Sequence, residues 1–324
     1  VATSAFAASR FARIVGASSP AHLLAGVLFA GSGLVAAALL EGHVYQVVNP
    51  WMPWMAMFLL RASRQGGHWE HGLLAGLCFA AALFSSGYLG VSAGIVAIGL
   101  GVYGLMNAPD RRPLLVAAVM GVGASVLFVQ LFSKAGLPAP DHATMDTLRM
   151  GSFSLNSIGA AMGEADRAHH SWALALSATM IALAALGVRS GLRGAKVLVA
   201  TAFVAMLVAM GPEWALGIAP DEPRMPSLFS ALWDLPEARF LRFPGRIMWA
   251  ALLPLSALAA VGLSVVMTRL GWKSMAMVVG LVIVETVASV RLPARQVVRS
   301  AEAPDAYRAA QGADAQRQTR LDPE

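Results

Sequence analysis

The feature that most constrains the fold of this chain is a series of long apolar runs that are almost free of charged residues. A membrane-crossing helix needs about 20 predominantly apolar residues, because each residue adds about 1.5 Å against a hydrocarbon layer about 30 Å thick. We interpret nine runs as candidate spans, and the sequence therefore predicts an all-α, polytopic transmembrane helical protein. These runs are 21–40, 49–60, 72–86, 88–107, 113–132, 171–188, 195–211, 247–268 and 274–291.

The composition agrees with this prediction and excludes several other classes of protein. Hydrophobic residues make up 57% of the chain and charged residues 13%, whereas soluble domains average about 25% charged residues. This balance excludes an ordinary soluble enzyme, a disordered chain and a nucleic-acid-binding module, so no nucleic acid is expected as a partner. The single cysteine, Cys78, excludes a disulfide within the chain and a zinc site made of thiolates.

The distribution of basic residues predicts the orientation of the chain. The short loops 41–48 and 86–88 contain no Lys or Arg, and the loops that alternate with them are basic. Because Lys and Arg concentrate on the cytoplasmic side of membrane proteins, we expect a cytoplasmic N-terminus and long outer segments at 133–170, 212–246 and 292–324. The basic residues assigned to the inner side are Arg10, Arg13, Arg61, Arg64, Arg111, Arg112, Arg189, Arg193, Lys196, Arg269 and Lys273.

The expected organisation is one transmembrane domain with a shorter segment at each end. We interpret 1–20 as the remnant of a preceding helix with a cytoplasmic linker, and 21–292 as the transmembrane domain. The segment 293–324 is interpreted as an extracytoplasmic tail that is itself truncated. Within the long outer loops, apolar residues and a tryptophan recur at helical spacing over 227–236, which predicts a short helix lying in the membrane interface.

Two pairs of glycines have the spacing that lets helices pack closely in a membrane. They are Gly72-x-x-x-Gly76 and Gly90-x-x-x-Gly94. In a chain with 31 glycines such pairs are also expected by chance, so we give them no functional meaning.

A first candidate site lies in the first predicted outer loop. Glu41 and His43 place a carboxylate and an imidazole two residues apart, and these are groups that a general base or a metal site uses. Trp51 and Trp54 follow at the start of the next span, where aromatic side chains often mark the membrane interface, and we interpret them as substrate-binding candidates. The alternative is an ordinary polar turn. No cofactor is evident, and a divalent metal is left open.

A second candidate site is a pair of arginines at the outer mouth of the eighth predicted span. Arg242 and Arg246 flank Pro244, at the level where the phosphate of a membrane lipid would lie. Planar guanidinium groups can bind phosphate oxygens through two parallel hydrogen bonds, so the pair is suited to a lipid-linked phosphate. The alternative is that both side chains simply extend to lipid headgroups.

Glu285 is the only acidic residue deep within an apolar run. A charged carboxylate costs roughly 2.5–3.5 kcal/mol at the centre of a bilayer, so it must be protonated, paired or close to water. We interpret Glu285 as a substrate-binding candidate, with a structural pair to an arginine such as Arg246 as the alternative.

The segment 68–71, His-Trp-Glu-His, is a weaker candidate for metal binding. Its two histidines are three residues apart, which is not the spacing of the zinc-protease motif. We interpret it as part of the inner membrane interface.

The order of these features resembles a known family. The elements that carry it are a glycine-containing apolar helix, Gly42-His43, a Trp-Met-Pro helix start, Arg242-x-Pro244-x-Arg246 at the entry to a long helix rich in Ala and Leu, Glu285 in the last helix, and Ala306-Tyr307-Arg308 in the tail. This arrangement is similar to bacterial polytopic membrane proteins of the C-type glycosyltransferase (GT-C) superfamily, especially the group related to YfhO. The resemblance covers most of residues 10–310.

The resemblance implies transfer of a sugar from a polyprenyl-phosphate donor to an acceptor on the outer face of the bacterial inner (plasma) membrane. It implies that His43 belongs to the outer site and that Arg242 and Arg246 bind the phosphate of the donor. In the superfamily the acidic catalytic residue usually follows the first helix, and the matching region here begins near the end of a third helix. We therefore expect an N-terminally truncated fragment without its main catalytic carboxylate.

Two other functions fit the same sequence. One is a transporter or flippase of a lipid-linked or anionic substrate, which should show internal repeats and polar groups near the middle of the membrane. The other is a non-catalytic scaffold that binds membrane lipid. Polar residues gather in the predicted outer loops, which favours chemistry at the membrane surface.

Overall fold

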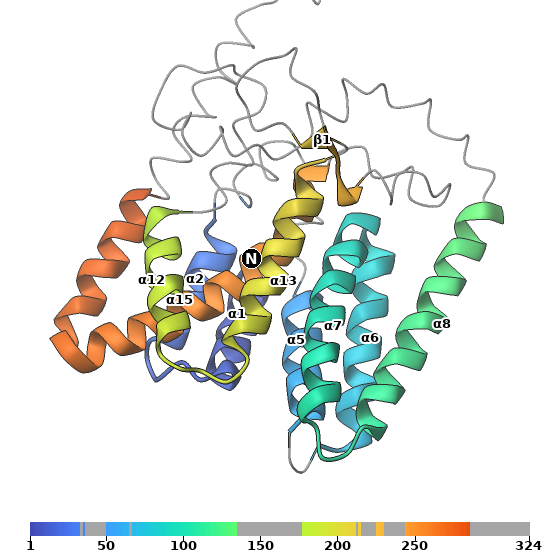
Figure 1. Cartoon of the computed structure of the whole chain (residues 1–324), viewed down its shortest axis with the longest axis horizontal. Helices are drawn as coiled ribbons and strands as arrows, with labels where there is room; N and C mark the ends of the chain where they lie inside the picture. Colours follow the sequence, from blue (N-terminus) through green and yellow to red (C-terminus); the bar gives the residue numbers. More distant parts are fainter. Residues whose placement is uncertain are drawn as a thin grey trace, which may run out of the picture.

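Helices make up almost all of the chain that the structure describes, which confirms the all-α prediction (Figure 1). The computed structural model describes residues 1–32, 35, 50–64, 67–134, 177–211, 213–214, 225–229 and 244–285. The only strands in these ranges are β1 (Glu213–Trp214) and β2 (Met225–Pro226), which form a short antiparallel pair.

The helices follow one another with short turns in the described ranges. They are α1 (Ala2–Val15), α2 (His22–Ala30), α5 (Trp51–Ala62), α6 (Trp69–Ser85), α7 (Gly87–Asn107), α8 (Arg112–Lys134), α12 (Ala178–Arg189), α13 (Ala195–Ala209), the 3-10 helix η2 (Pro244–Met248) and α15 (Trp249–Leu270). Residues 273–285 are helical as well.

Three helical segments are long and apolar enough to cross a membrane, namely α7, Arg112–Leu131 in α8, and Pro244–Leu270, which joins η2 to α15. The apolar helices α6, α12 and α13 contain 17, 12 and 15 residues. At 1.5 Å per residue they extend roughly 18–26 Å, less than the hydrocarbon thickness. The expected count of nine spans is therefore wrong for the described residues, because an apolar run does not by itself give a helix the length of a bilayer.

α15 is the central helix of the structure. In an apolar stretch of 18 residues within Pro244–Leu270, 72% of the residues are buried. The helices α1, α2, α12 and α13 all pack against α15 (Figure 1). The helix is rich in Ala, Leu, Gly and Ser, and small side chains let neighbouring backbones approach closely. α1 contributes Phe11 and α2 contributes Leu24 to this core, each 1% exposed.

A close helix contact joins α12 to α15 through a glycine on each helix. A Cβ atom at Gly262 would overlap the carbonyl oxygen of Leu183, and a Cβ atom at Gly187 would overlap the carbonyl oxygen of Leu258. The two backbones therefore touch without side chains between them, which gives van der Waals contact that larger residues would prevent.

α8 lies at the edge of the structure and is the least buried of the candidate spans, with 17% of its apolar window buried (Figure 1). It packs mainly against α6. A Cβ atom at Gly72 would overlap the backbone of Pro113, and one at Gly76 would overlap the side chain of Met120. The first of the two glycine pairs in the sequence is therefore a helix-packing face.

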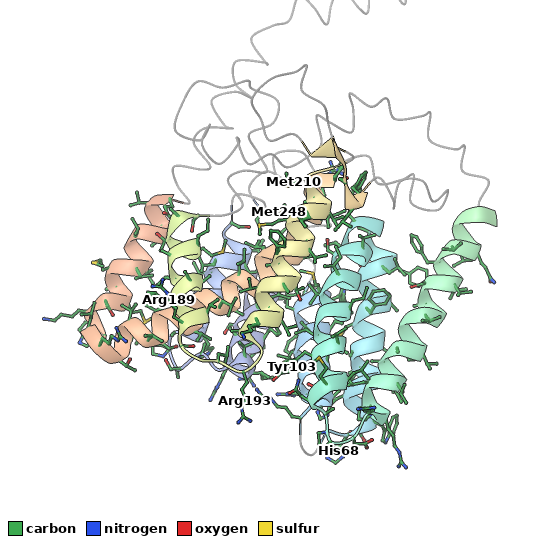
Figure 2. All side chains as sticks on the ribbon, viewed as in Figure 1. His68, Tyr103, Arg189, Arg193, Met210 and Met248 are labelled. Atoms are coloured by element: carbon green, nitrogen blue, oxygen red, sulfur yellow. The ribbon has the colours of Figure 1, made fainter. Side chains whose placement is uncertain are left out.

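The connecting segments gather at two opposite ends of the helices (Figure 1). The turns from α5 to α6, from α7 to α8 and from α12 to α13 share one end, which we call the arginine end. The opposite end, which we call the loop end, contains the C-termini of α8 and α13 and the N-termini of α12 and η2. Arg193, Tyr103 and His68 lie toward the arginine end, and Met210 and Met248 toward the loop end (Figure 2). The basic turns thus share one end, and the side of the membrane that it faces stays a prediction.

The glycine contact between α12 and α15 leads to a stability prediction. We expect Gly262→Ala to destabilise the protein by about 1–3 kcal/mol, because an inserted methyl group must push the two helices apart. The measurement is the thermal unfolding midpoint of the purified protein in detergent.

The matched control is Gly280→Ala in the helical segment 273–285, where a Cβ atom meets open space. Its midpoint should stay the same or rise, because alanine favours a helix over glycine by about 0.5–1 kcal/mol. Equal midpoints for the two variants would show that the α12–α15 contact is not tight.

Candidate functional site

The structure describes four of the seven residues that the sequence singles out for a site. Trp51, Trp54, Arg246 and Glu285 are described, and Glu41, His43 and Arg242 lie outside the described residues. The 227–236 segment, expected to form an interfacial helix, is described only up to residue 229. The convergence of these elements on one site therefore stays a prediction.

Arg246 lies in η2 at the loop end, where the chain enters α15. Its side chain is only 6% exposed, and its Cζ atom lies 5.4 Å from the centre of the Tyr88 ring, at the start of α7. A guanidinium over an aromatic face is attracted by the electron density of the ring, by about 0.5–2 kcal/mol depending on how far it is removed from water. Most of Arg246 is therefore covered by protein, and whether it contacts a lipid headgroup or a lipid-linked phosphate stays a prediction.

Two neighbouring contacts fix the position of η2. The Ser92 Oγ atom of α7 donates to the carbonyl oxygen of Ile247 at 3.5 Å. Trp249, the first residue of α15, packs edge-on against Phe29 of α2 with ring centroids 5.5 Å apart. These contacts join the entry of α15 to α7 and α2, and they position the backbone that carries Arg246.

Sequence reasoning missed the aromatic residues near the entry of α15, Tyr88, which contacts Arg246, and Trp249, which contacts Phe29. Tyr88 and Trp249 are 8% and 2% exposed, and the indole Nε1 atom of Trp249 is buried without a hydrogen-bond partner among the residues that the structure describes. Buried tyrosine and tryptophan usually find a partner for the polar atom. The position of Tyr88 at a helix start was visible in the sequence, but nothing there linked it to Arg246.

Glu285 stabilises the beginning of α12. Its Oε1 atom accepts a hydrogen bond from the backbone N–H of Thr179 at 3.2 Å, and Ser177 Oγ accepts from the N–H of Met180 at 3.0 Å. Two N–H groups at the start of α12 are thereby satisfied, and a carboxylate at this end also complements the helix dipole. The structure thus gives Glu285 a structural role, and its contact with substrate stays a prediction.

Trp51 and Trp54 differ in their surroundings. Trp51 begins α5 and is 40% exposed, as expected of an aromatic residue at a membrane interface. Trp54 is partly buried and contacts Phe6 of α1 and Phe58 of α5, with ring centroids 5.9 and 6.0 Å away. Trp54 therefore packs α5 against α1, and binding of substrate by either tryptophan stays a prediction.

The 68–71 segment is a helix cap. His71 Nδ1 accepts a hydrogen bond from the backbone N–H of His68 at 3.2 Å, and the His68 side chain accepts one from the backbone of His71. This reciprocal arrangement satisfies two N–H groups at the start of α6. No group of three or more His, Cys, Asp or Glu residues that could hold a metal ion occurs in the described part of the chain.

Comparison with known proteins gives no family for this chain: no family model matches it, and neither does any curated protein or solved structure. The fold defines its class as a helical protein with three candidate membrane spans. The likeness to the GT-C superfamily therefore rests on sequence features alone.

The contact of Glu285 with Thr179 predicts different outcomes for two substitutions. Glu285→Gln keeps an oxygen that can accept the hydrogen bond and should leave thermal stability nearly unchanged. Glu285→Leu removes the acceptor and should cost about 0.5–2 kcal/mol, the range for loss of a helix cap. Thermal unfolding of both purified variants tests this, and a leucine variant as stable as the glutamine variant would contradict the capping role.

The cap at the start of α6 predicts a dependence on pH. Burial lowers the pKa of His71 below its ordinary value of 6.5, and the charges of Arg61 and His68 act in the same direction, against Glu70. The folded state therefore favours neutral His71, whose Nδ1 atom can accept the His68 hydrogen bond. We expect this contribution to be fully present above pH 6.5 and to be lost as the pH falls from 6.5 through the lowered pKa.

The measurement is an NMR titration of the His71 ring in the detergent-solubilised protein, assigned with a His71→Gln variant. The glutamine keeps an acceptor and does not titrate, so its unfolding midpoint should fall less between pH 7 and pH 5 than that of the wild type. A His71 pKa at or above 6.5 would refute the cap.

Proposed function

We propose that this chain binds the phosphate of a polyprenyl-phosphate-linked sugar at the loop end and acts in transfer of that sugar, as a glycosyltransferase of the GT-C type or part of one. The observation that supports the proposal is Arg246, an arginine enclosed by protein at the entry of the central helix. A buried cation is costly in a membrane protein and typically marks a functional or paired group.

The geometry of Arg246 suits it to a phosphate. The guanidinium carries five N–H donors in one plane, and its Cζ atom lies over the ring of Tyr88. A phosphate would meet these donors in the plane, through charge-assisted hydrogen bonds. In this proposal Arg242, four residues earlier, adds a second guanidinium.

The reaction would use this phosphate contact to stabilise the leaving group. An acceptor oxygen forms a bond to the anomeric carbon of the sugar, the bond from that carbon to the phosphate oxygen breaks, and the electron pair stays on the phosphate. A base takes the proton of the acceptor hydroxyl, and the sequence offers Glu41 and His43 for this task. Arg246 would neutralise the negative charge that develops on the phosphate.

A flippase of the same lipid and a non-catalytic lipid-binding scaffold would use the same phosphate contact. Turnover distinguishes them, because only the transferase consumes the glycosylated lipid. A transporter should carry polar groups within the membrane, and Glu285 was the one acidic residue that suggested such a group. Its hydrogen bond to the start of α12 gives it a structural role instead, which weakens the case for a transporter.

The proposal predicts that binding of polyprenyl phosphate depends on Arg246. Arg246→Lys retains the charge but loses the planar fork, and we expect it to weaken binding roughly tenfold or more. Arg242→Ala together with Arg246→Ala should abolish binding. Native mass spectrometry of the solubilised protein with added polyprenyl phosphate measures retention of the lipid.

The matched control is Arg269→Ala, which removes an exposed arginine from the last turn of α15 and should leave binding unchanged. The unfolding midpoint of Arg246→Lys shows whether a loss of binding is a loss of fold. Unchanged retention of polyprenyl phosphate by a folded Arg246→Lys variant would refute the phosphate site.

A further inference from the structure

A cavity at the arginine end is lined by polar and basic side chains from helices that are distant in sequence. Its volume is about 380 Å³, which falls within the range of small-molecule sites. Apolar residues of α1, α5, α7 and α13 form part of its wall. The polar residues that line it are Ser63, Arg64, Tyr103, Asn107 and Arg193.

Arg64 is positioned by the end of α1. Its Nη2 atom donates a hydrogen bond to the carbonyl oxygen of Ile14, in the last turn of that helix. A cation is favourable next to the carbonyl groups at a helix C-terminus. This contact uses one nitrogen of the guanidinium and ties the side chain to the mouth of the cavity, while the side chain as a whole stays exposed.

Tyr103 is positioned by the beginning of α13. Gly194 is the N-cap of α13 and has a φ of 90°, a backbone conformation that favours glycine. A Cβ atom at this position would lie 3.1 Å from the tyrosine ring, so the missing side chain lets the ring pack on the start of α13. Asn107 extends this arrangement, because its Nδ2 atom donates to the carbonyl oxygen of Tyr103 at 2.8 Å.

The cavity therefore combines two guanidinium groups, a phenol and an amide with the N-terminus of a helix of 15 residues. The positive end of the α13 dipole adds to the charge of the arginines. The acidic residues among the described turns at this end are Glu70 and Asp110, neither of which lines the cavity. Asp110 accepts a hydrogen bond from the backbone N–H of Arg112.

We propose that this cavity binds a phosphate group, carried either by an anionic lipid headgroup or by a soluble phosphate compound. Arg193 and Arg64 contact the phosphate oxygens from opposite elements, the α12–α13 turn and the end of α5. Tyr103 and Asn107 offer neutral hydrogen bonds, and the apolar wall holds the part of the ligand next to the phosphate. This site is at the opposite end of the helices from Arg246, so it is separate from the proposed donor site.

The test uses the full chain and two probes. Isothermal titration calorimetry with sodium pyrophosphate, on protein in phosphatidylcholine nanodiscs, measures binding of a soluble phosphate. Native mass spectrometry of the solubilised protein, with phosphatidylglycerol against phosphatidylcholine, measures binding of an anionic headgroup. Arg193→Gln is the main variant, because its exposed side chain can be replaced without disturbing the core, and Arg64→Gln is the second.

The matched control is Arg269→Gln, which removes the same charge from an exposed arginine that does not line the cavity. We expect saturable binding of at least one probe, weakened roughly tenfold or more in Arg193→Gln and Arg64→Gln and unchanged in Arg269→Gln. Arg246→Lys should leave this binding unchanged, which separates the site from the donor site.

The two probes assign the source of the phosphate. Retention of phosphatidylglycerol over phosphatidylcholine without pyrophosphate binding supports a lipid headgroup, and pyrophosphate binding without a lipid preference supports a soluble compound. Absence of saturable binding of either probe overturns the proposal. An equal loss in Arg269→Gln and Arg193→Gln also overturns it, because it would show only general attraction of anions to a basic surface.

Discussion

The structure depends on close contact between helix backbones at α15. Small residues on this helix let α12 approach until the carbonyl of Leu183 lies where a Gly262 side chain would be. The hydrophobic effect does not distinguish helix contacts from lipid contacts inside a membrane, so dense packing and backbone proximity must hold such helices together. With α15 fixed in this way, its first residues and η2 are also fixed, and Arg246 is held beside Tyr88.

The two ends of the structure use arginine differently. At the loop end one arginine is enclosed by protein and lies against an aromatic ring. At the arginine end, Arg64 and Arg193 are exposed at the mouth of a cavity, and backbone features of α1 and α13 organise its surroundings. A buried cation gives strong but rigid interactions, whereas exposed cations attract ligands over a longer range and are weakened by salt.

Local sequence predicted most of the helices, but it could not predict contacts between distant segments. The apolar runs 88–107 and 113–132 correspond closely to α7 and α8, since hydropathy follows their whole length. α6 begins earlier than its apolar run because hydrogen bonds of His68 and His71 cap it. The contacts of the candidate site could not be predicted in this way. Burial of Arg246 against Tyr88 and the hydrogen bond from Thr179 to Glu285 both arise from packing of helices that are distant in sequence.

The shallow burial of α8 bears on how the protein is assembled. A long apolar helix satisfies its own backbone hydrogen bonds and is stable in hydrocarbon before it meets any neighbour. α8 fits this description, with little of its surface covered by the rest of the chain. α15 has most of its surface covered by other helices, so its final environment exists only after they have arrived. Biosynthesis would therefore place α8 in the bilayer early, and enclosure of α15 would be the late, cooperative step.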